Sequence, residues 1–210
     1  MRVPQLHIHS AFSMRRGATL PEMLTEAASR LGYTHLAITD RDGLWAVPRF
    51  IAGCARAGIT PILGSQLTDP SKPARRVVAL TENIEAFKRL SEIVSLRQLD
   101  LEEKFNPVDA VIENADDGFV LIADHPEILR ELHTKIPPGR LFGELCWGAK
   151  SPSRKRFFAM MRACRELKRP AVASGNVYMA TRAEYMLHAI LTAMRTGRCL
   201  RDRLPAVDPA

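Results

Sequence analysis

The sequence contains no apolar run that approaches the ~20 residues needed to span a bilayer. Its opening residues, 1–7, also lack the apolar centre and the small-residue cleavage site of a signal peptide. These absences predict a cytoplasmic protein with no membrane partner. The cysteines are few and far apart, and no two have the spacing of a zinc ribbon or a redox pair. We therefore expect reduced thiols at Cys54, Cys146, Cys164 and Cys199.

The common short motifs of nucleotide-binding and acyl-transfer enzymes are missing as well. There is no glycine-rich phosphate loop and no nucleophile elbow. The length of 210 residues suits one domain, and 46% apolar with 25% charged residues is ordinary for a globular chain. We predict a single domain over residues 1–198, followed by a tail or linker over 199–210.

The charge is unevenly distributed along the chain. Residues 1–139 carry 16 Lys and Arg against 18 Asp and Glu, whereas residues 140–210 carry 14 against 5. A basic half suggests contact with nucleic acid; a solvated helix face with a basic tail is the alternative. The phosphate-contacting candidates lie on one predicted helix, 153–168, and are Arg154, Lys155, Arg156, Arg162 and Arg165.

Short apolar runs alternate with amphipathic segments, which predicts an α/β fold with parallel strands. The candidate strands are residues 5–9, 35–39, 60–64, 76–80, 119–123, 141–146 and 171–174. Seven such units in a short chain suggest an irregular barrel, with an open doubly wound sheet as the alternative. In both architectures the functional face lies at the carboxyl ends of the strands.

The clearest helix signal follows Thr19. Thr19 and Glu22 have the spacing of a capping box, and Gly32 suits the position after the helix. Further helices are predicted to start at Thr81, with Ile84 facing inward, and to cover about 153–168 and 182–195. The polar segment 96–107 is predicted to be a loop.

Two histidines at the end of the first strand are candidate metal ligands. His7 and His9 are two residues apart, so their rings can point to the same face of a strand. They can form half of a divalent-metal site; alternatively, they only form hydrogen bonds near the barrel mouth. Asp40 ends the second strand and can act as a ligand, support a histidine or cap a helix.

Several segments, taken in order, resemble the PHP (polymerase and histidinol phosphatase) domain at the N-terminus of bacterial DNA polymerase III alpha-type subunits, especially the error-prone kind. They are residues 7–13, 16–18, 21–24, 32–33, 36–44, 57–64, 170–178 and 188–197. The resemblance covers nearly the whole chain. It implies the family's irregular seven-stranded (β/α)7 barrel, a TIM-like fold with metals at the carboxyl ends of the strands.

Most of the family's metal ligands are replaced. Arg16 stands where the opening motif supplies a further ligand, and Arg41 stands where a histidine follows Asp40. Gln66 replaces the glutamate that ends the third motif, and Asn176 and Tyr178 replace an aspartate and a histidine.

The matching positions keep His7, His9 and the supporting Asp40, while Asp124 and His125 are candidates for a middle motif. An arginine has no lone pair to donate to a metal. A weak zinc or manganese site is then the most that these residues predict.

The resemblance, together with the lost ligands, implies a structural or docking role in DNA replication or damage-tolerant synthesis. Polymerase subunits or domains are the expected partners, and DNA is a further candidate. The alternatives are a metal-dependent phosphoesterase or 3′–5′ exonuclease acting on DNA ends, and a basic nucleic-acid-binding module. The replacing arginines can also form a phosphate-binding pocket or pair with Asp40 and Asp42.

Overall fold

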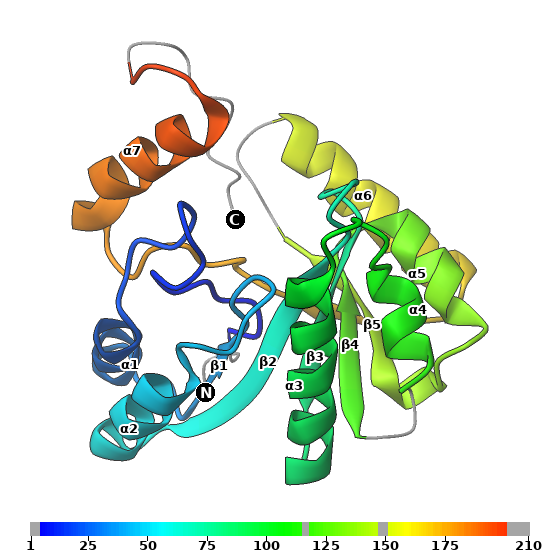
Figure 1. Ribbon diagram of the computed structural model, residues 1–210, viewed down its shortest axis with the longest axis horizontal. Coiled ribbons are helices and arrows are strands. Elements are labelled where there is room, and N and C mark those ends of the chain that lie inside the picture. The colour runs from blue at the N-terminus through cyan, green and yellow to red at the C-terminus, as the bar shows by residue number, and fades with distance from the viewer. Residues whose placement is uncertain (1–4, 115–117, 147–150, 201–210) are drawn as a thin grey trace.

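The computed structural model of the chain describes residues 5–114, 118–146 and 151–200, and the side chains from residue 154 onward in the last range. Its centre is one curled sheet whose strands follow the chain order (Figure 1). The strands are β1 (His35–Ile38), β2 (Thr60–Thr68), β3 (Arg76–Thr81), β4 (Phe119–Ala123), β5 (Leu141–Leu145) and β6 (Ala171–Ala173).

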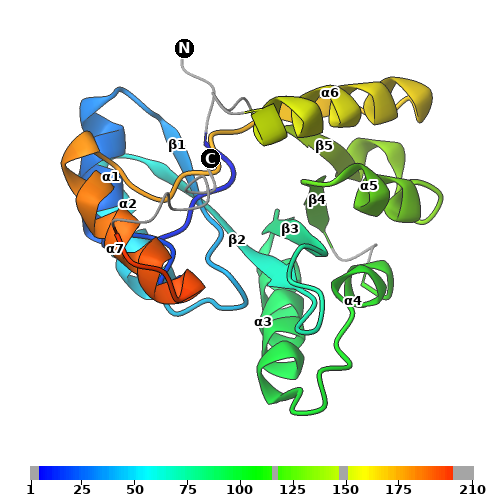
Figure 2. The ribbon, with the colours of Figure 1, turned by 90° about the horizontal axis from the view of Figure 1, so that it is seen from above.

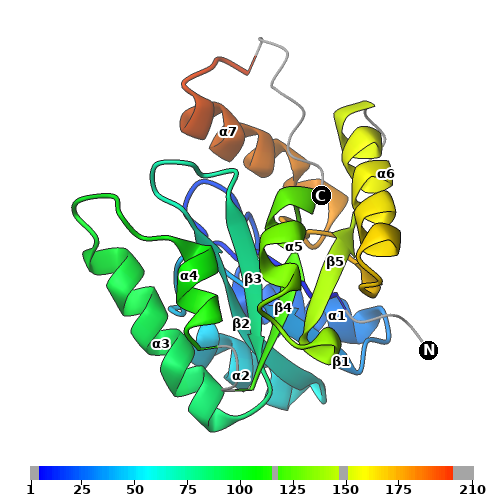
Figure 3. The same cartoon turned by 90° about the vertical axis from the view of Figure 1, so that its right-hand side faces the viewer.

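Helices cover the outer face of this sheet (Figure 2). The α-helices of the described residues are α1 (Pro21–Arg30), α2 (Val47–Ala57), α3 (Ile84–Leu99), α4 (Pro107–Ile112), α5 (Pro126–His133), α6 (Ser151–Glu166) and α7 (Tyr185–Thr196). Helix α2 packs on β2, α3 and α4 pack on β3, and α5 and α6 pack on β5. Helix α7 lies at one end of the sheet, on the same side of the molecule as the upper end of α6 (Figure 3). None of the helices within the described ranges is long and apolar enough to cross a bilayer.

The strands are not all parallel, so the expectation of a purely parallel sheet was wrong. β1 pairs in parallel with β2, and β4, β5 and β6 pair in parallel with one another. β3 runs antiparallel to both β2 and β4, with Leu67 opposite Val77 and Val78 opposite Ile122. The short loop between β2 and β3 explains this reversal, because a parallel crossover needs a dozen or more residues.

Residues 5–9 run extended beside the sheet but contribute a single bridge, between Ile8 and Val177. The Ala37 amide donates to the Gln5 carbonyl at 3.1 Å, and the Val177 amide donates to the His7 carbonyl at 2.8 Å. The sheet is therefore a six-stranded half-barrel within the described residues, and the seven-stranded barrel is not confirmed.

The two faces of the sheet differ in chemistry. Alternate strand residues such as Val77, Ala79 and Leu121 pack outward against the helices in the largest apolar cluster. Their neighbours face the concave side and form a smaller apolar cluster: Leu6, Ala37, Ile62, Val78, Leu80, Val120, Ile122 and Val172. At the carboxyl ends of the parallel strands the same concave side carries buried polar residues, and this polar layer is the candidate site.

The helix predictions needed three corrections. The capping box was wrong, because the Thr19 hydroxyl accepts from the Ala180 amide at 2.9 Å and Glu22 pairs with Arg49. Helix α3 begins after an Asn83 cap rather than at Thr81, and Ile84 is 64% exposed instead of facing inward. The segment 96–107 is helical as far as Leu99, and the loop begins only after it. Within the predicted tail, residues 201–210 lie outside the described ranges.

Candidate functional site

The polar layer gathers side chains from distant parts of the chain at one end of the half-barrel. Its buried members are His7, His9, Asp40, Gln66, Arg76, Asp124, Glu144, Asn176 and Tyr178. Parallel strands end at this edge, and the antiparallel strand β3 begins here, so Arg76 enters the layer as the first residue of its strand. The structure therefore places His7, His9 and Asp40 in one buried layer.

His7 is held between two side chains and is fully buried. Its Nδ1 lies 2.8 Å from Oε1 of Glu144, and its Nε2 lies 2.9 Å from the amide nitrogen of Gln66. The Gln66 amide donates, so Nε2 accepts and the ring proton on Nδ1 is donated to Glu144. The lone pair that a metal would need on His7 is thus engaged by Gln66.

His9 is also fully buried, and its Nδ1 lies 3.0 Å from the Ser13 hydroxyl. Its Nε2 is buried with no hydrogen-bond partner among the described residues. Burial, followed by the charges of His7, Arg16 and other nearby arginines, lowers the pKa of His9 well below its ordinary value. The ring is therefore held neutral, with one lone pair free.

Asp40 joins the N-terminal loop to the end of β1. Its carboxylate accepts from the Ser10 amide at 2.7 Å, from the Ser10 hydroxyl at 2.6 Å and from the Ser13 hydroxyl at 2.6 Å. Burial raises the pKa of Asp40, and the hydrogen bonds from Ser10 and Ser13 oppose this shift. Its oxygens therefore serve the local fold.

The two arginines predicted at ligand positions lie beside this layer. Arg41 reaches away from Asp40, with Nε 3.4 Å from the Asp42 carboxylate and 3.3 Å from the Thr68 hydroxyl. Burial lowers the pKa of Arg16 to about 10, with smaller contributions from the charges of Arg41 and Arg195. The interaction with Tyr178 opposes this shift. The layer is consequently bordered by positive charge.

Glu144 and Arg76 were missed in the sequence. Glu144 is the carboxylate that holds His7, and Arg76 pairs with Asp124 through Nε and Oδ2 at 2.5 Å. Burial raises the pKa of Glu144, but its electrostatic attraction and hydrogen bond to His7, together with a hydrogen bond from Ser174 and the charge of Arg76, outweigh this and lower it overall. The signal for Glu144 was a lone acid inside an apolar strand, because such a residue needs a buried partner.

Aromatic rings close the layer on the side of α7. Tyr178 stacks on His9 with ring centroids 4.7 Å apart and planes 10° apart, and His188 of α7 stacks on Tyr178 at 5.4 Å. His188 Nδ1 also lies 2.8 Å from the carbonyl oxygen of Arg16. Asn176 is buried nearby with φ 44°, and its Oδ1 has no hydrogen-bond partner among the described residues.

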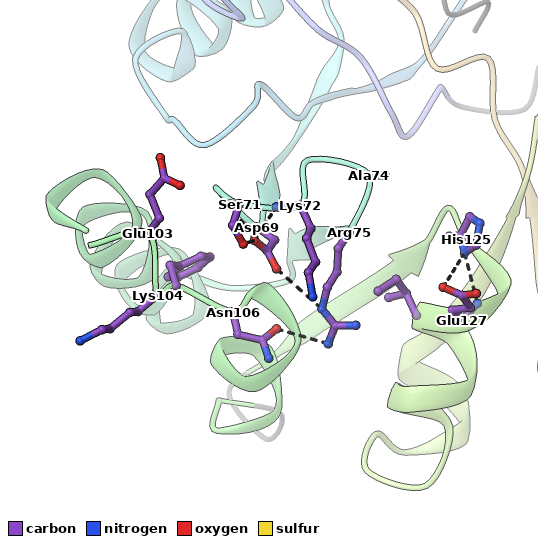
Figure 4. Close-up of a pocket in the computed structure, with 12 residues that line it drawn as sticks. Asp69, Ser71, Lys72, Ala74, Arg75, Glu103, Lys104, Asn106, His125 and Glu127 are labelled. Carbon is purple, nitrogen blue, oxygen red and sulfur yellow. Dashed lines mark hydrogen bonds and ion pairs between the residues drawn. The ribbon is translucent and has the colours of Figure 1, made fainter. Parts of the chain in front are cut away.

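His125 is not brought to the polar layer. Its ring accepts from the Glu127 amide at 3.4 Å as the cap of α5, and it lines a cavity of about 830 Å³ beside the β2–β3 loop. Figure 4 shows this cavity, with Arg75 reaching from that loop toward Asn106 and His125 turned toward Glu127. Asp124, the residue before His125, does belong to the polar layer.

The predicted nucleic-acid-binding residues all lie on α6 and are exposed. Arg154, Phe158, Arg162 and Arg165 recur at helical spacing and share one face, opposite the buried Met160 and Ala163. Lys155 lies at the edge of this face, and Arg156 lies on another side of the helix. An exposed aromatic ring, 50% accessible at Phe158, therefore lies within a basic stripe.

Comparisons with known proteins identify the family. Residues 5–145 match the PHP domain family. The error-prone DNA polymerase of Pseudomonas fluorescens is 30% identical over 197 residues, which cover 91% of this chain and 19% of that protein. The error-prone DNA polymerase of Mycobacterium tuberculosis is 35% identical over 122 residues, which cover 53% of this chain and 11% of that protein. The chain thus spans about a fifth or less of these relatives.

Solved structures support the same fold. A two-domain protein of Bacteroides vulgatus that contains a PHP-like metal-dependent phosphoesterase aligns over 93% of this chain and 55% of its own, with a TM-score of 0.58 at 13% identity. A metal-dependent phosphoesterase of Bifidobacterium adolescentis aligns over 83% of this chain and 87% of its own, with a TM-score of 0.55 at 14% identity. The chain belongs to the PHP domain family, and the sequence resemblance is confirmed.

Proposed function

We propose that this chain is a PHP domain whose metal site has become a structural hydrogen-bond network, and that it serves an error-prone DNA polymerase by docking and stabilisation. The observation that carries this proposal is the hydrogen bond between the Gln66 amide and Nε2 of His7. A glutamate at that position would offer a metal a carboxylate, whereas the amide occupies the histidine's own lone pair.

The remaining donors do not fit a divalent metal. Among the described residues, no group of three or more His, Cys, Asp or Glu side chains is placed to hold one. Asp40 is fully used by Ser10 and Ser13. Asp124 and Asn176 each keep one buried oxygen without a hydrogen-bond partner among the described residues, but the Asp124 carboxylate is already paired with Arg76. The imidazole donor that remains free is Nε2 of His9. Arg16 and Arg41 place positive charge beside that atom, which opposes a dication.

Metal content tests the first part of the proposal. Untagged protein prepared without chelators should contain substoichiometric zinc and manganese by elemental analysis. A restored variant carrying Arg41→His, Gln66→Glu, Asn176→Asp and Tyr178→His should gain stoichiometric metal, because it regains anionic and imidazole donors. The same variant with His7→Ala is the matched control and should lose the metal again.

Stoichiometric metal in the unmodified chain, lost on His7→Ala, would contradict the proposal. It would favour the alternative of a metal-dependent phosphoesterase or 3′–5′ exonuclease, and a screen of phosphoesters and DNA ends with Mn²⁺ would then follow.

Helix α7 supports the docking part. It presents large apolar side chains to solvent, with Met186 60%, Ile190 38% and Met194 61% exposed at intervals of four residues along one face. An apolar stripe of this kind marks a protein-interaction surface. The region matched by this chain makes up 19% of the Pseudomonas fluorescens polymerase. The remaining part of such a polymerase is the surface on which we propose that the chain docks.

Complementation in trans tests docking. We would remove the matching region from the Pseudomonas fluorescens polymerase and add this chain, measuring the thermal midpoint and primer extension. The chain should raise both, and a variant with Met186→Lys and Ile190→Lys should not. No effect of the unmodified chain, at concentrations well above those of the polymerase, would refute docking of this relative.

The face of α6 favours DNA binding as a second function. Arg154, Arg162 and Arg165 flank the exposed ring of Phe158, a combination suited to a phosphate backbone and a base. Binding to single-stranded DNA should weaken steeply with salt, and Arg162→Gln with Arg165→Gln should reduce the salt slope by about 1–2. Salt-independent binding would show that the stripe only keeps the helix solvated.

A further inference from the structure

A second, cationic cavity lies on the outside of the polar layer. It has a volume of about 380 Å³, and four arginines line it: Arg15, Arg16, Arg41 and Arg195. These come from the N-terminal loop, from the residue after Asp40 and from the end of α7, so the fold gathers them from distant parts of the chain. Among the described residues of the lining, Asp42 is the single carboxylate.

Asp42 does not neutralise all four arginines, because its carboxylate already has other partners. Its carboxylate accepts from the Thr68 amide at 2.7 Å and from the Thr68 hydroxyl at 2.5 Å. It also lies 3.4 Å from Nε of Arg41 and 3.7 Å from Arg97. Two guanidinium groups thus share the one aspartate, and none of its ion pairs reaches Arg16 or Arg195.

Arg16 and Arg195 lie close enough to repel each other. Burial and the charges of Arg41 and Arg195 lower the pKa of Arg16 to about 10, with a smaller opposing effect from Tyr178. Nε of Arg195 is buried and has no hydrogen-bond partner among the described residues. Half-buried like charges without an acid are unfavourable unless an anion completes the site.

An aromatic ring borders the same cavity. Trp45 is 54% exposed, yet its ring packs directly on Gly43, where a Cβ would lie 2.0 Å from a ring carbon. The glycine therefore lets the indole lie against the chain beside the arginines. A fixed, exposed indole is a surface on which a base can stack.

We propose that this cavity binds a nucleoside phosphate, with Arg16 and Arg195 contacting the phosphate oxygens and Trp45 stacking on the base. The shared chemistry is a phosphate next to a planar ring, supplied by a free nucleotide or by the phosphorylated end of a DNA strand. This site is separate from the docking surface proposed above, because it uses none of the apolar residues on the exposed face of α7. It would leave the domain able to recognise a nucleotide without a metal.

Titration calorimetry with defined probes tests the proposal. The probes are inorganic phosphate, thymidine 5′-monophosphate, thymidine, and a short oligo-dT with and without a 5′-phosphate. The monophosphate should bind, thymidine should not, and the affinity should fall as salt is raised. Tighter binding of the phosphorylated oligonucleotide than of the monophosphate would identify a strand end as the source, and the reverse order a free nucleotide.

Single substitutions separate the two contacts. Arg16→Gln and Arg195→Gln should each weaken binding of the monophosphate and of phosphate by about tenfold or more. Trp45→Leu should weaken the monophosphate by roughly five- to a hundredfold and leave phosphate unchanged. Arg30→Gln, an exposed arginine on α1, is the matched control and should bind like the unmodified chain.

Two results would overturn the proposal: no binding of the monophosphate at millimolar concentration, or equal binding by Arg16→Gln, Arg195→Gln and Arg30→Gln. Ligand-induced stabilisation gives an independent readout, since the monophosphate should raise the thermal midpoint of Arg30→Gln but not of Arg16→Gln. Failure here would leave the docking role untouched, because complementation in trans does not depend on these arginines. Arg162→Gln distinguishes this cavity from the basic stripe on α6, because this variant should bind the monophosphate as tightly as the unmodified chain.

Discussion

The clearest test of a structural network is the removal of Asp40. Asp40→Ala leaves three buried donors without an acceptor, namely the Ser10 amide and the hydroxyls of Ser10 and Ser13. Hydrogen bonds to a charged group contribute about 1.5–3 kcal/mol each. The substitution also removes a buried charge, whose burial raises the pKa of Asp40, and this gain offsets part of the loss. We expect a net loss of about 4 kcal/mol in the free energy of unfolding.

Asp40→Asn separates the hydrogen bonds from the charge. Its amide oxygen can still accept from the Ser10 amide and the Ser13 hydroxyl, and its NH₂ group can donate to the Ser10 oxygen. The loss should therefore be smaller, about 1–2 kcal/mol. If Asp40 were instead chiefly a metal ligand, Asp40→Ala and Asp40→Asn would have the same free energy of unfolding in the presence of a chelator.

Urea unfolding at pH 7, followed by circular dichroism, measures both variants against the unmodified chain. Asp100→Ala is a suitable control, because this partly exposed carboxylate also accepts from two backbone amides, those of Lys104 and Phe105. It should lose less stability than Asp40→Ala. A loss below about 1 kcal/mol for Asp40→Ala, or equal losses for the alanine and asparagine variants, would refute the reasoning.

Three further predictions concern the surroundings of Asp40. Gly17→Ala should lower the thermal midpoint sharply, because its Cβ would lie 2.0 Å from the Ser10 carbonyl oxygen; an unchanged midpoint would contradict this packing. The pKa of His9 is lowered in the folded protein, so its neutral ring contributes to stability above about pH 6.5, and this contribution is lost as the pH falls below that value. In urea unfolding between pH 7.5 and pH 5, the free energy of unfolding should therefore fall more steeply for the unmodified chain than for His9→Gln. Arg76→Met should cost about 3–5 kcal/mol by stranding Asp124, and adding Asp124→Leu should recover much of it; additive losses in this cycle would refute the coupling of the pair.

The order and type of most strands could be predicted from sequence. Apolar runs of four to six residues located all six strands of the sheet to within a few residues, because the central strands β3 and β4 are largely buried and the runs are bounded by turn-forming residues. The periodicity also located α1, α6 and α7. Gly32 ends α1 with φ 75°, as its place in the sequence predicted.

Strand direction and polar partners could not be predicted in the same way. The reversal of β3 depends on the length of the loop before it, and the longer extent of β2, to Thr68, hid how short that loop is. The partner of His7 is Glu144, 137 residues away, and a pairing over that distance is set by the tertiary fold. Thr19 was misassigned for the same reason, since its acceptor role serves Ala180 rather than its own helix.

Under the proposed function, the ligand set of the candidate site has changed its role while the fold is kept. A buried histidine and a buried aspartate each need partners, whether or not a metal supplies them. In this chain Gln66 and Glu144 satisfy His7, and two serines satisfy Asp40. A glutamate at position 66 would place a second carboxylate on the other side of the His7 ring from Glu144, and the two would need a positive charge, from a metal or from a protonated His7, whereas the amide needs none. The exchange of charge for hydrogen bonding at this one position therefore explains how His7 can remain buried with both ring nitrogens satisfied by protein groups.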